Sequence, residues 1–107
     1  DNVMGYSFGP NGTEILQMVD YEAIKDNLDG YTLIDVRTLP EFEGKHLEKA
    51  LRFELPFLAD SLNSIPRNKP IVTICGTGFR ASIAASILQK AGFDDVSLLK
   101  RGMQSVT

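Results

Sequence analysis

Residues 71–80 read IVTICGTGFR and join a short apolar run to a turn that contains two glycines. The run at 71–74 is apolar enough for a central β-strand that is buried on both faces. Between residues 80 and 91 follows a helical stripe of apolar side chains, Ile83, Ala84, Ile87, Leu88 and Ala91. Gly92 suits the left-handed residue that ends a helix, and Phe93 can then fold back onto Leu88. The stretch therefore predicts a buried strand that leads directly into an amphipathic helix.

The same alternation of apolar runs and helical patterns extends along the chain in both directions. The predicted strands lie at 15–19, 33–36, 51–55, 71–74 and 96–99. Further helices are predicted from an N-cap at Asp20 to Leu28, from a start near Thr38 and Pro40, and at 58–65. Strands that alternate with helices indicate a three-layer α/β fold, with a five-stranded, mainly parallel sheet flanked by helices. Ligands of such sheets bind beyond the carboxyl ends of the strands, and Cys75 lies at one of these ends.

The length of 107 residues is that of one domain with a single core. We expect residues 1–13 to form an N-terminal arm and residues 14–107 to form the domain. The formal net charge of -3 argues against a nucleic-acid binder, which normally has a clustered basic face. No stretch reaches the roughly 18 consecutive apolar residues of a membrane span, and no signal-peptide pattern is visible. We therefore expect a cytoplasmic protein that does not act at a membrane.

The chain contains one cysteine and one histidine. No internal disulfide can form, and the two residues do not supply the ligands of a structural zinc site. Glycines 76 and 78 let backbone N–H groups point inward, which creates an anion site at a helix N-terminus. The anion is either a substrate oxyanion or the thiolate of Cys75, which a nearby Arg80 favours. The pattern indicates a nucleophilic cysteine.

Other polar residues are explained more simply without catalysis. His46 lies in a charged, loop-like segment, and we interpret it as structural. Asp35 and Arg37 stand at the end of a predicted strand, where we expect an internal hydrogen-bonded pair. The remaining charged pairs are interpreted as solvated, and they are Asp94-Asp95 and Lys100-Arg101.

A series of short motifs resembles the rhodanese-like sulfurtransferase family in order and spacing, over about residues 15 to 106. The motifs are Asp35-Val36-Arg37 after an aliphatic run, Glu41-Phe42, His46-Leu47, Ala50, Cys75 with Gly78, Ala91-Gly92-Phe93 and Gly102-Met103. Each motif is weak alone, and their combination is specific. The chain is most similar to members that consist of a single domain.

The resemblance implies a five-stranded parallel sheet in which Cys75 carries sulfane sulfur as a persulfide. It also implies a substrate-binding loop, which consists of Gly76, Thr77, Gly78, Phe79 and Arg80. The expected donor is thiosulfate, mercaptopyruvate or a low-molecular-weight persulfide. The expected acceptor is cyanide, a small thiol or a protein. Neither a metal nor an organic cofactor is expected.

The chain departs from the family pattern at several positions. Gly76 stands where many members have an Arg that would attract thiosulfate. The Cys-Gly-Thr-Gly pattern resembles mercaptopyruvate sulfurtransferases, but Arg80 stands where these usually have Thr. Lys45 and Lys49 replace glycines, and Val106 replaces an aromatic residue. We therefore expect thiosulfate to be a poorer donor than mercaptopyruvate or a persulfide.

Two other function classes are alternatives to a sulfurtransferase. Cell-cycle dual-specificity phosphatases resemble this fold, but their Arg lies six residues after the Cys, and Arg80 lies five after Cys75. So tight a ring leaves too little room for a phosphate, and Ile74 precedes Cys75 where those enzymes often have His. These features argue against a phosphatase. The second alternative is a module that senses sulfur or delivers it to one partner. Such a module takes up sulfur once and stops, whereas an enzyme repeatedly moves sulfur from donor to acceptor.

Overall fold

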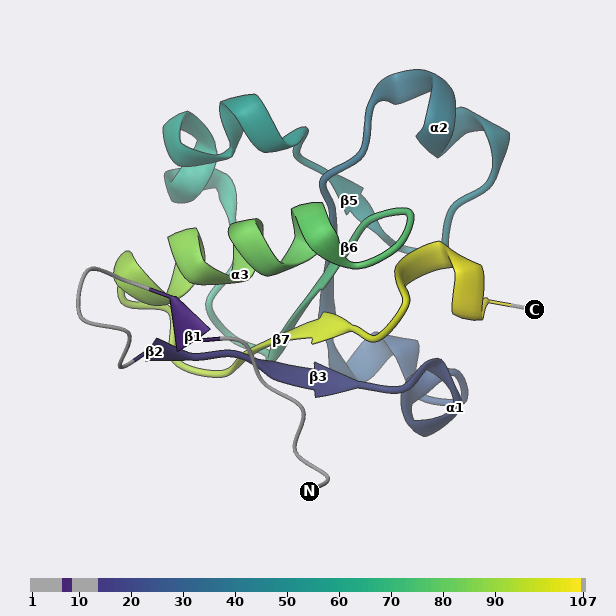
Figure 1. Cartoon of the computed structure of the whole chain (residues 1–107), viewed down its shortest axis with the longest axis horizontal. Helices are drawn as coiled ribbons and strands as arrows, with labels where there is room; N and C mark the ends of the chain where they lie inside the picture. The colour runs from purple at the N-terminus through teal and green to yellow at the C-terminus, as the bar shows by residue number, and fades with distance from the viewer. Residues whose placement is uncertain (1–6, 9–13, 107) are drawn as a thin grey trace.

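The computed structural model describes residues 7–8 and 14–106. Its centre is a five-stranded sheet whose strands are all parallel, in the order β3-β7-β6-β4-β5 (Figure 1). The strands are β3 at Gln17–Val19, β4 at Thr32–Asp35, β5 at Leu51–Arg52, β6 at Ile71–Ile74 and β7 at Val96–Leu99. The predicted α/β fold is confirmed, and β6 is the middle strand, as the apolar run at 71–74 predicted.

Helices cover both faces of this sheet, so the fold has three layers (Figure 1). On one face pack the α-helix α3 at Phe79–Lys90 and the 3₁₀ helix η2 at Leu55–Ser64. On the other pack α1 at Tyr21–Ile24 and the 3₁₀ helices η1 at Leu28–Gly30 and η3 at Gly102–Ser105. Helix α2 at Leu39–Gly44 connects β4 to β5. None of the helices in the described part of the chain has the length and apolar character of a membrane-spanning segment.

Successive residues of the central strands point to opposite faces of the sheet, and both faces are apolar. In β4, Leu33 packs with α1 and Ile34 packs with α3. Ile71 and Val72 of β6 divide between the two sides in the same way. This two-sided burial explains why the strands read as continuous apolar runs in the sequence.

The predicted strand at 15–19 is divided between two sheets. Glu14–Ile15 forms β2, which pairs antiparallel with β1 at Ser7–Phe8, whereas β3 pairs with β7. Leu16 lies between β2 and β3 and is fully buried, so the chain changes sheets there. Apart from β1, the predicted arm at residues 1–13 lies outside the described residues. The arm and its boundary therefore stay predictions.

The predicted helix from Asp20 to Leu28 is wrong in length, because α1 is a single turn. Asp20 stands at the N-cap position, but its side chain makes no capping hydrogen bond. Ile24 is the buried residue of α1, so little packing supports a longer helix. Asn27, of a type that favours turns, adopts φ -144° and precedes η1.

The boundaries predicted after β4 are also shifted. The predicted strand at 51–55 ends at Arg52, and the chain enters η2 at Leu55 instead of 58. Pro56 lies in the first turn of η2, where its missing N–H leaves no bond unmade. The segment is a 3₁₀ helix rather than an α-helix, with Leu58 as its buried residue. Four of the five residues at 60–64 are polar and form α-helices weakly, which is consistent with this result.

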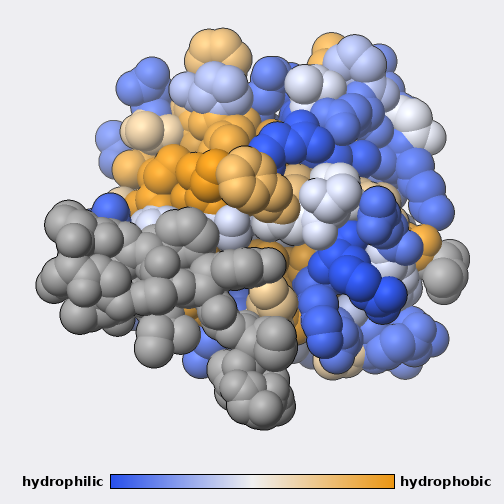
Figure 2. Space-filling view, viewed as in Figure 1, coloured by the Kyte–Doolittle hydropathy of each residue, from blue (hydrophilic) through white to orange (hydrophobic). Residues whose placement is uncertain are grey.

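Helix α3 agrees with the prediction in extent but differs in its buried side. Ile83 and Ile87 of the predicted stripe stay partly exposed, and Figure 2 shows apolar surface gathered over α3 and η2. The buried positions are mostly small and are Ala81, Ser82, Ala84, Ala85, Ser86 and Leu88. Small side chains let α3 lie close to the sheet, where the Thr73 hydroxyl donates a hydrogen bond of 2.8 Å to the Ala81 carbonyl.

The end of α3 is as predicted and ties the helix to the start of β6. Gly92 adopts the left-handed region, with φ 95°. The Phe93 N–H donates a hydrogen bond of 3.1 Å to the Leu88 carbonyl. The Arg67 guanidinium, which precedes β6, lies 3.8 Å from the centre of the Phe93 ring. With its carboxyl end held in this way, α3 directs its first turn toward the carboxyl end of β6.

Candidate functional site

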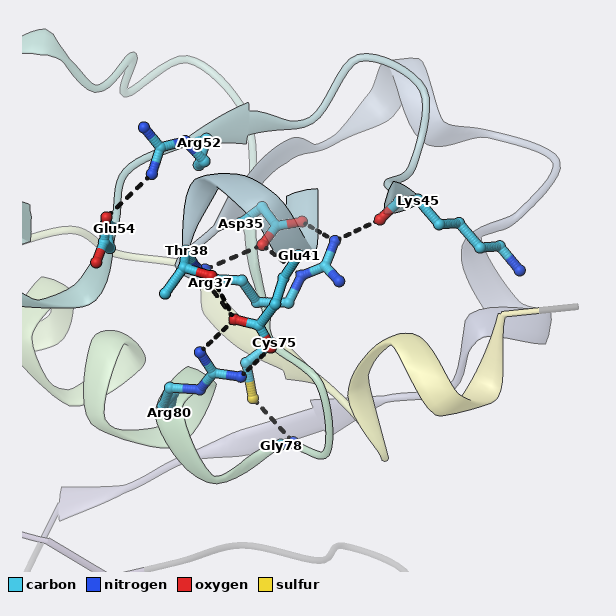
Figure 3. Close-up of polar contacts among 10 residues, drawn as sticks. All are labelled: Asp35, Arg37, Thr38, Glu41, Lys45, Arg52, Glu54, Cys75, Gly78 and Arg80. Carbon is cyan, nitrogen blue, oxygen red and sulfur yellow. Dashed lines mark hydrogen bonds and ion pairs between the residues drawn. The ribbon is translucent and has the colours of Figure 1, made fainter. Parts of the chain in front are cut away.

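Cys75 directly follows β6, at the edge where the parallel strands end. Open parallel sheets bind their ligands at this edge. The residue is 1% exposed, and its thiol is free of any disulfide. The Gly78 N–H donates a hydrogen bond of 2.9 Å to Sγ of Cys75 (Figure 3). A donor aimed at the sulfur stabilises negative charge there, which is what a thiolate nucleophile requires.

The loop that the sequence predicts follows Cys75 directly and contacts its sulfur through Gly78. Gly76, Thr77 and Gly78 connect β6 to α3, and Phe79 and Arg80 begin the helix. Gly78 stands at the N-cap with φ +121°, a conformation that L side chains rarely adopt. That conformation places its N–H against the sulfur. Thr77 and Phe79 are exposed, so the loop lies at the surface although the sulfur does not.

A second element, η3, is hydrogen-bonded to the backbone carbonyls of the loop. The Met103 N–H donates a hydrogen bond of 2.7 Å to the Cys75 carbonyl, and the Gln104 N–H donates one of 3.3 Å to the Gly76 carbonyl. Gly102 has φ +54°, and a Cβ there would overlap the Cys75 carbonyl oxygen. The sequence identified Gly102-Met103 only as a motif and missed this contact. A lone glycine between a strand and the following turn is the signal that could have suggested it.

Arg80 reaches across to helix α2. Its Nη1 lies 2.9 Å from Oε1 of Glu41, and its Nη2 lies 3.0 Å from Oε2, which makes a bidentate ion pair between residues 39 apart in the chain. The sequence predicted a cation beside Cys75 and missed its carboxylate partner. The Thr38 N–H and hydroxyl also donate to Glu41 Oε1, at 3.2 and 3.0 Å. The Thr-x-x-Glu spacing of a capping box is the signal that could have placed Glu41 at the start of α2.

The ion pair shifts the pKa of both partners. The hydrogen bonds from Arg80 lower the pKa of Glu41 from 4.5 to about 2, burial opposes this shift, and the hydrogen bonds from Thr38 each add a smaller decrease. Glu41 in turn holds the pKa of Arg80 above its usual value, with a smaller contribution from the charge of Cys75. Both groups are therefore charged wherever the protein functions near neutral pH.

Asp35 and Arg37 form the internal pair that the sequence predicted. Arg37 Nε donates to Asp35 Oδ1 and Arg37 Nη2 to Oδ2, both at 2.9 Å. Nη2 also donates to the Lys45 carbonyl at 2.6 Å, which ties the chain after α2 to β4. Both side chains are buried, Asp35 completely. This geometry satisfies the buried charges and gives the pair a structural role.

His46 also contacts its own segment. Its ring stacks on Phe42 with 3.8 Å between centroids, and its Nδ1 donates a hydrogen bond of 2.7 Å to the Phe42 carbonyl. These contacts agree with the structural interpretation. Asp94, Asp95 and Arg101 are exposed, which agrees with solvated charges.

Several hollows of the surface lie away from Cys75. One of about 290 Å³, lined by residues that include Arg67, Phe93 and Asp94, lies where β6 begins. That is the opposite edge of the sheet from the loop. Over the part of the chain that the structure describes, no three His, Cys, Asp or Glu side chains gather in a way that could hold a metal ion.

Comparison with known proteins agrees with the fold. A family model, the rhodanese-like domain, matches residues 20–107. The putative sulfur carrier protein YrkF of Bacillus subtilis (strain 168) is 29% identical over 92 residues, which are 83% of this chain and 50% of that protein. Thiosulfate sulfurtransferase GlpE of Pseudomonas syringae pv. syringae (strain B728a) is 31% identical over 75 residues, 70% of this chain and 71% of that one.

Among solved structures, the chain is similar to an NAD-dependent persulfide reductase from A. fulgidus. The TM-score is 0.72 with 33% identity, and the match covers 86% of this chain and 16% of that one. The chain thus spans half the length of the putative carrier and a small part of the reductase. Domains of this kind occur both as most of a protein and as one part of a larger protein.

Proposed function

The chain belongs to the rhodanese-like domain family, and from this premise we propose that it is a sulfurtransferase that carries sulfane sulfur as a persulfide on Cys75. The observation that carries the proposal is the 2.9 Å hydrogen bond from the Gly78 N–H to the Cys75 sulfur, at the end of the central strand. This N–H stabilises the Cys75 thiolate both before the sulfur is loaded and after it has been passed on. The proposal places the reaction in a reducing compartment such as the cytoplasm, where a single cysteine stays a thiol.

The first half-reaction loads the sulfur. The Cys75 thiolate attacks the outer sulfur of a small donor and forms a new S–S bond. The bond between that sulfur and the rest of the donor breaks, and its electron pair leaves with the donor fragment. Thiosulfate releases sulfite, a low-molecular-weight persulfide releases a thiolate, and mercaptopyruvate releases pyruvate once the thiol proton has moved to carbon.

The second half-reaction passes the sulfur on. The acceptor, cyanide or the thiolate of a small molecule or protein, attacks the outer sulfur of the persulfide. The S–S bond breaks, and its electron pair returns to Cys75 as thiolate. Cyanide leaves as thiocyanate and a thiolate leaves as a new persulfide, so atoms and electrons balance without a metal or organic cofactor.

Intact-mass spectrometry of the purified chain tests the proposal. After incubation with thiosulfate, mercaptopyruvate or glutathione persulfide, we expect the mass of one added sulfur atom, which cyanide or a reductant removes. The Cys75→Ser variant, which keeps a side chain of similar size, should gain nothing. Sulfur transfer by Cys75→Ser, or no loading of the wild-type chain by any of the three donors, contradicts the proposal.

A module that delivers sulfur to one protein partner is the second candidate. Two observations favour it: the similar domain covers only 16% of the persulfide reductase chain, and YrkF is named a putative sulfur carrier. Turnover separates the two candidates. An enzyme forms many thiocyanate molecules per Cys75 from donor and cyanide, whereas a delivery module loads stoichiometrically and then stops until its partner is added.

A further inference from the structure

The Glu41–Arg80 ion pair lies beside the mouth of the Cys75 loop. It joins the first turn of α2 to the first turn of α3, with both nitrogen–oxygen distances at or below 3.0 Å. A Cβ on Gly76 would lie 3.5 Å from Arg80 Nη2, so the guanidinium rests against the loop. Figure 3 shows both side chains next to the Cys75 sulfur. A donor that approaches the sulfur therefore meets a carboxylate as well as a cation.

The two other arginines drawn in Figure 3 are also paired with carboxylates. Arg37 is held by both oxygens of Asp35, and Arg52 lies 3.2 Å from a carboxylate oxygen of Glu54 (Figure 3). Each of the three arginines drawn there thus has a carboxylate partner. Because Glu41 is bound to Arg80, it cancels much of the attraction that Arg80 alone would exert on an anionic donor, and the attraction lost grows with each negative charge that the donor brings.

We propose that Glu41 is a specificity-determining residue, which disfavours donors with two negative charges relative to donors with one or none. The inference rests on the proposed function for the nature of the reaction. Its physical basis is the burial of Cys75, which brings the donor into a region where charges are less screened than in water. The attraction that Glu41 cancels grows with the charge of the donor, so thiosulfate, a dianion, loses more of it than mercaptopyruvate, a monoanion near neutral pH.

Glu41→Gln removes the charge and keeps the shape. Gln serves at the third position of a capping box as Glu does, so α2 retains its start at Thr38. Its amide oxygen can still accept a hydrogen bond from Arg80. Glu43→Gln is the matched control, because Glu43 is exposed on the same helix and its substitution changes the net charge equally.

Alkylation of Cys75 measures the electrostatic effect without any sulfur chemistry. The probes are iodoacetate, an anion, and iodoacetamide, which is neutral and of similar size. We expect the ratio of their second-order rate constants, iodoacetate over iodoacetamide, to rise roughly threefold in Glu41→Gln at low salt. The ratio should stay unchanged in Glu43→Gln. No rise in Glu41→Gln, or an equal rise in both variants, overturns the inference.

Sulfur loading then tests the donor preference itself. The rate at which Cys75 gains one sulfur atom is measured by mass for thiosulfate and for mercaptopyruvate, and we expect the thiosulfate-to-mercaptopyruvate ratio to rise about threefold in Glu41→Gln. If wild type loads sulfur but neither ratio responds, the role of Glu41 is wrong and the proposed function stands. If no donor loads wild type while the alkylation ratio responds, the proposed function is wrong and the charge selection at the thiol stands.

Discussion

The backbone N–H of Met103 donates a hydrogen bond of 2.7 Å to the carbonyl oxygen of Cys75. The next N–H along η3, that of Gln104, donates to the Gly76 carbonyl at 3.3 Å. The loop is thus fixed from two sides, by η3 at its carbonyls and by the Gly78 N–H at its sulfur. These hydrogen bonds, all donated by backbone N–H groups, hold the Cys75 sulfur against the Gly78 N–H. Substitution of the glycines in the loop and in η3 therefore tests this arrangement.

Gly102→Ala should damage both stability and sulfur loading. A Cβ at Gly102 would overlap the Cys75 carbonyl oxygen and lie 2.9 Å from the carbonyl carbons of Cys75 and Gly76, at a φ of +54°. Left-handed strain and backbone overlap together should lower the free energy of unfolding by about 2 kcal/mol or more. Chemical denaturation measures the loss of stability, and the rate at which Cys75 gains one sulfur atom from a donor measures the loss of loading.

The matched control for Gly102→Ala is Gly44→Ala. Nothing lies within 4 Å of a Cβ at Gly44, which ends α2. Alanine is the better helix former, so this variant should be as stable as wild type or slightly more stable. Equal stability of both variants would mean that the loop moves away from Gly102 without cost, which would contradict its role as a close support.

Gly78→Ala should slow loading more than it destabilises the fold. The nearest atom to a Cβ at Gly78 lies 3.8 Å away, so the substitution meets no overlap, but φ +121° strains any L side chain. Relief of that strain turns the N–H away from the Cys75 sulfur. We expect loading to fall roughly tenfold, since a hydrogen bond to a charged group is worth about 1.5–3 kcal/mol and each 1.4 kcal/mol is a factor of ten.

Gly92→Ala provides the comparison for Gly78→Ala. Gly92 has φ +95° with nothing within 4 Å of its Cβ position, so the backbone strain is similar. It lies at the far end of α3 from Cys75. This variant should lose about 1 kcal/mol of stability and load sulfur at the wild-type rate. If both variants load equally fast, the Gly78 N–H does not contribute to the reaction.

Burial on both faces made much of the fold predictable from the sequence. Strands β4, β6 and β7 bury all their residues and read as apolar runs, so their positions were predicted closely. The segments that were misjudged bury few side chains, and α1 and η2 each have one buried residue. In these segments packing is too weak to decide the length and type of the helix, so the spacing of apolar residues in the sequence does not predict them.

The site was predictable only where neighbours in the sequence are neighbours in space. Cys75 and its loop follow one another, so their shared place was predicted. Glu41 is 39 residues from Arg80, and Met103 is brought to Cys75 by the order of the strands. A single sequence contains no direct signal for such contacts. The Thr-x-x-Glu spacing of a capping box could have located Glu41 on α2, but not its partner Arg80.

The low pKa of Glu41 predicts how its contribution to stability depends on pH. The hydrogen bonds from Arg80 lower this pKa to about 2 in the folded protein, from 4.5. A depressed carboxyl pKa stabilises the fold above the unfolded value, and the contribution is lost as the pH falls from about 4.5 toward 2. The side chain is 41% exposed, so solvent screening reduces the contribution to no more than about 1 kcal/mol.

Denaturant unfolding of wild type and Glu41→Gln from neutral to acid pH checks this expectation. The difference in the free energy of unfolding should be constant at neutral pH and shrink toward zero in acid. A difference that does not depend on pH would show that Glu41 acts through packing or capping, without a contribution from its charge.

Arg80→Ala should slow sulfur loading for two reasons that act in the same direction. It removes a guanidinium that rests against the loop, and it leaves the Glu41 carboxylate without its bidentate partner beside the thiol. Both changes disfavour an anionic sulfur, so we expect alkylation of Cys75 by iodoacetamide and sulfur loading both to slow, loading roughly tenfold or more.

The double variant Arg80→Ala/Glu41→Gln separates the two causes. It lacks the cation but also lacks the unpaired carboxylate, so it should load faster than Arg80→Ala and more slowly than wild type.

Thermal melts should change little, because Arg80 is 34% exposed and such a pair contributes at most about 1 kcal/mol. Unchanged rates of alkylation and of loading in Arg80→Ala would make Arg80 a surface residue of the first helical turn. A large drop in melting temperature would instead make the Glu41–Arg80 pair a structural clamp between α2 and α3. Loading by the double variant as slow as that by Arg80→Ala would assign the whole effect to the lost cation.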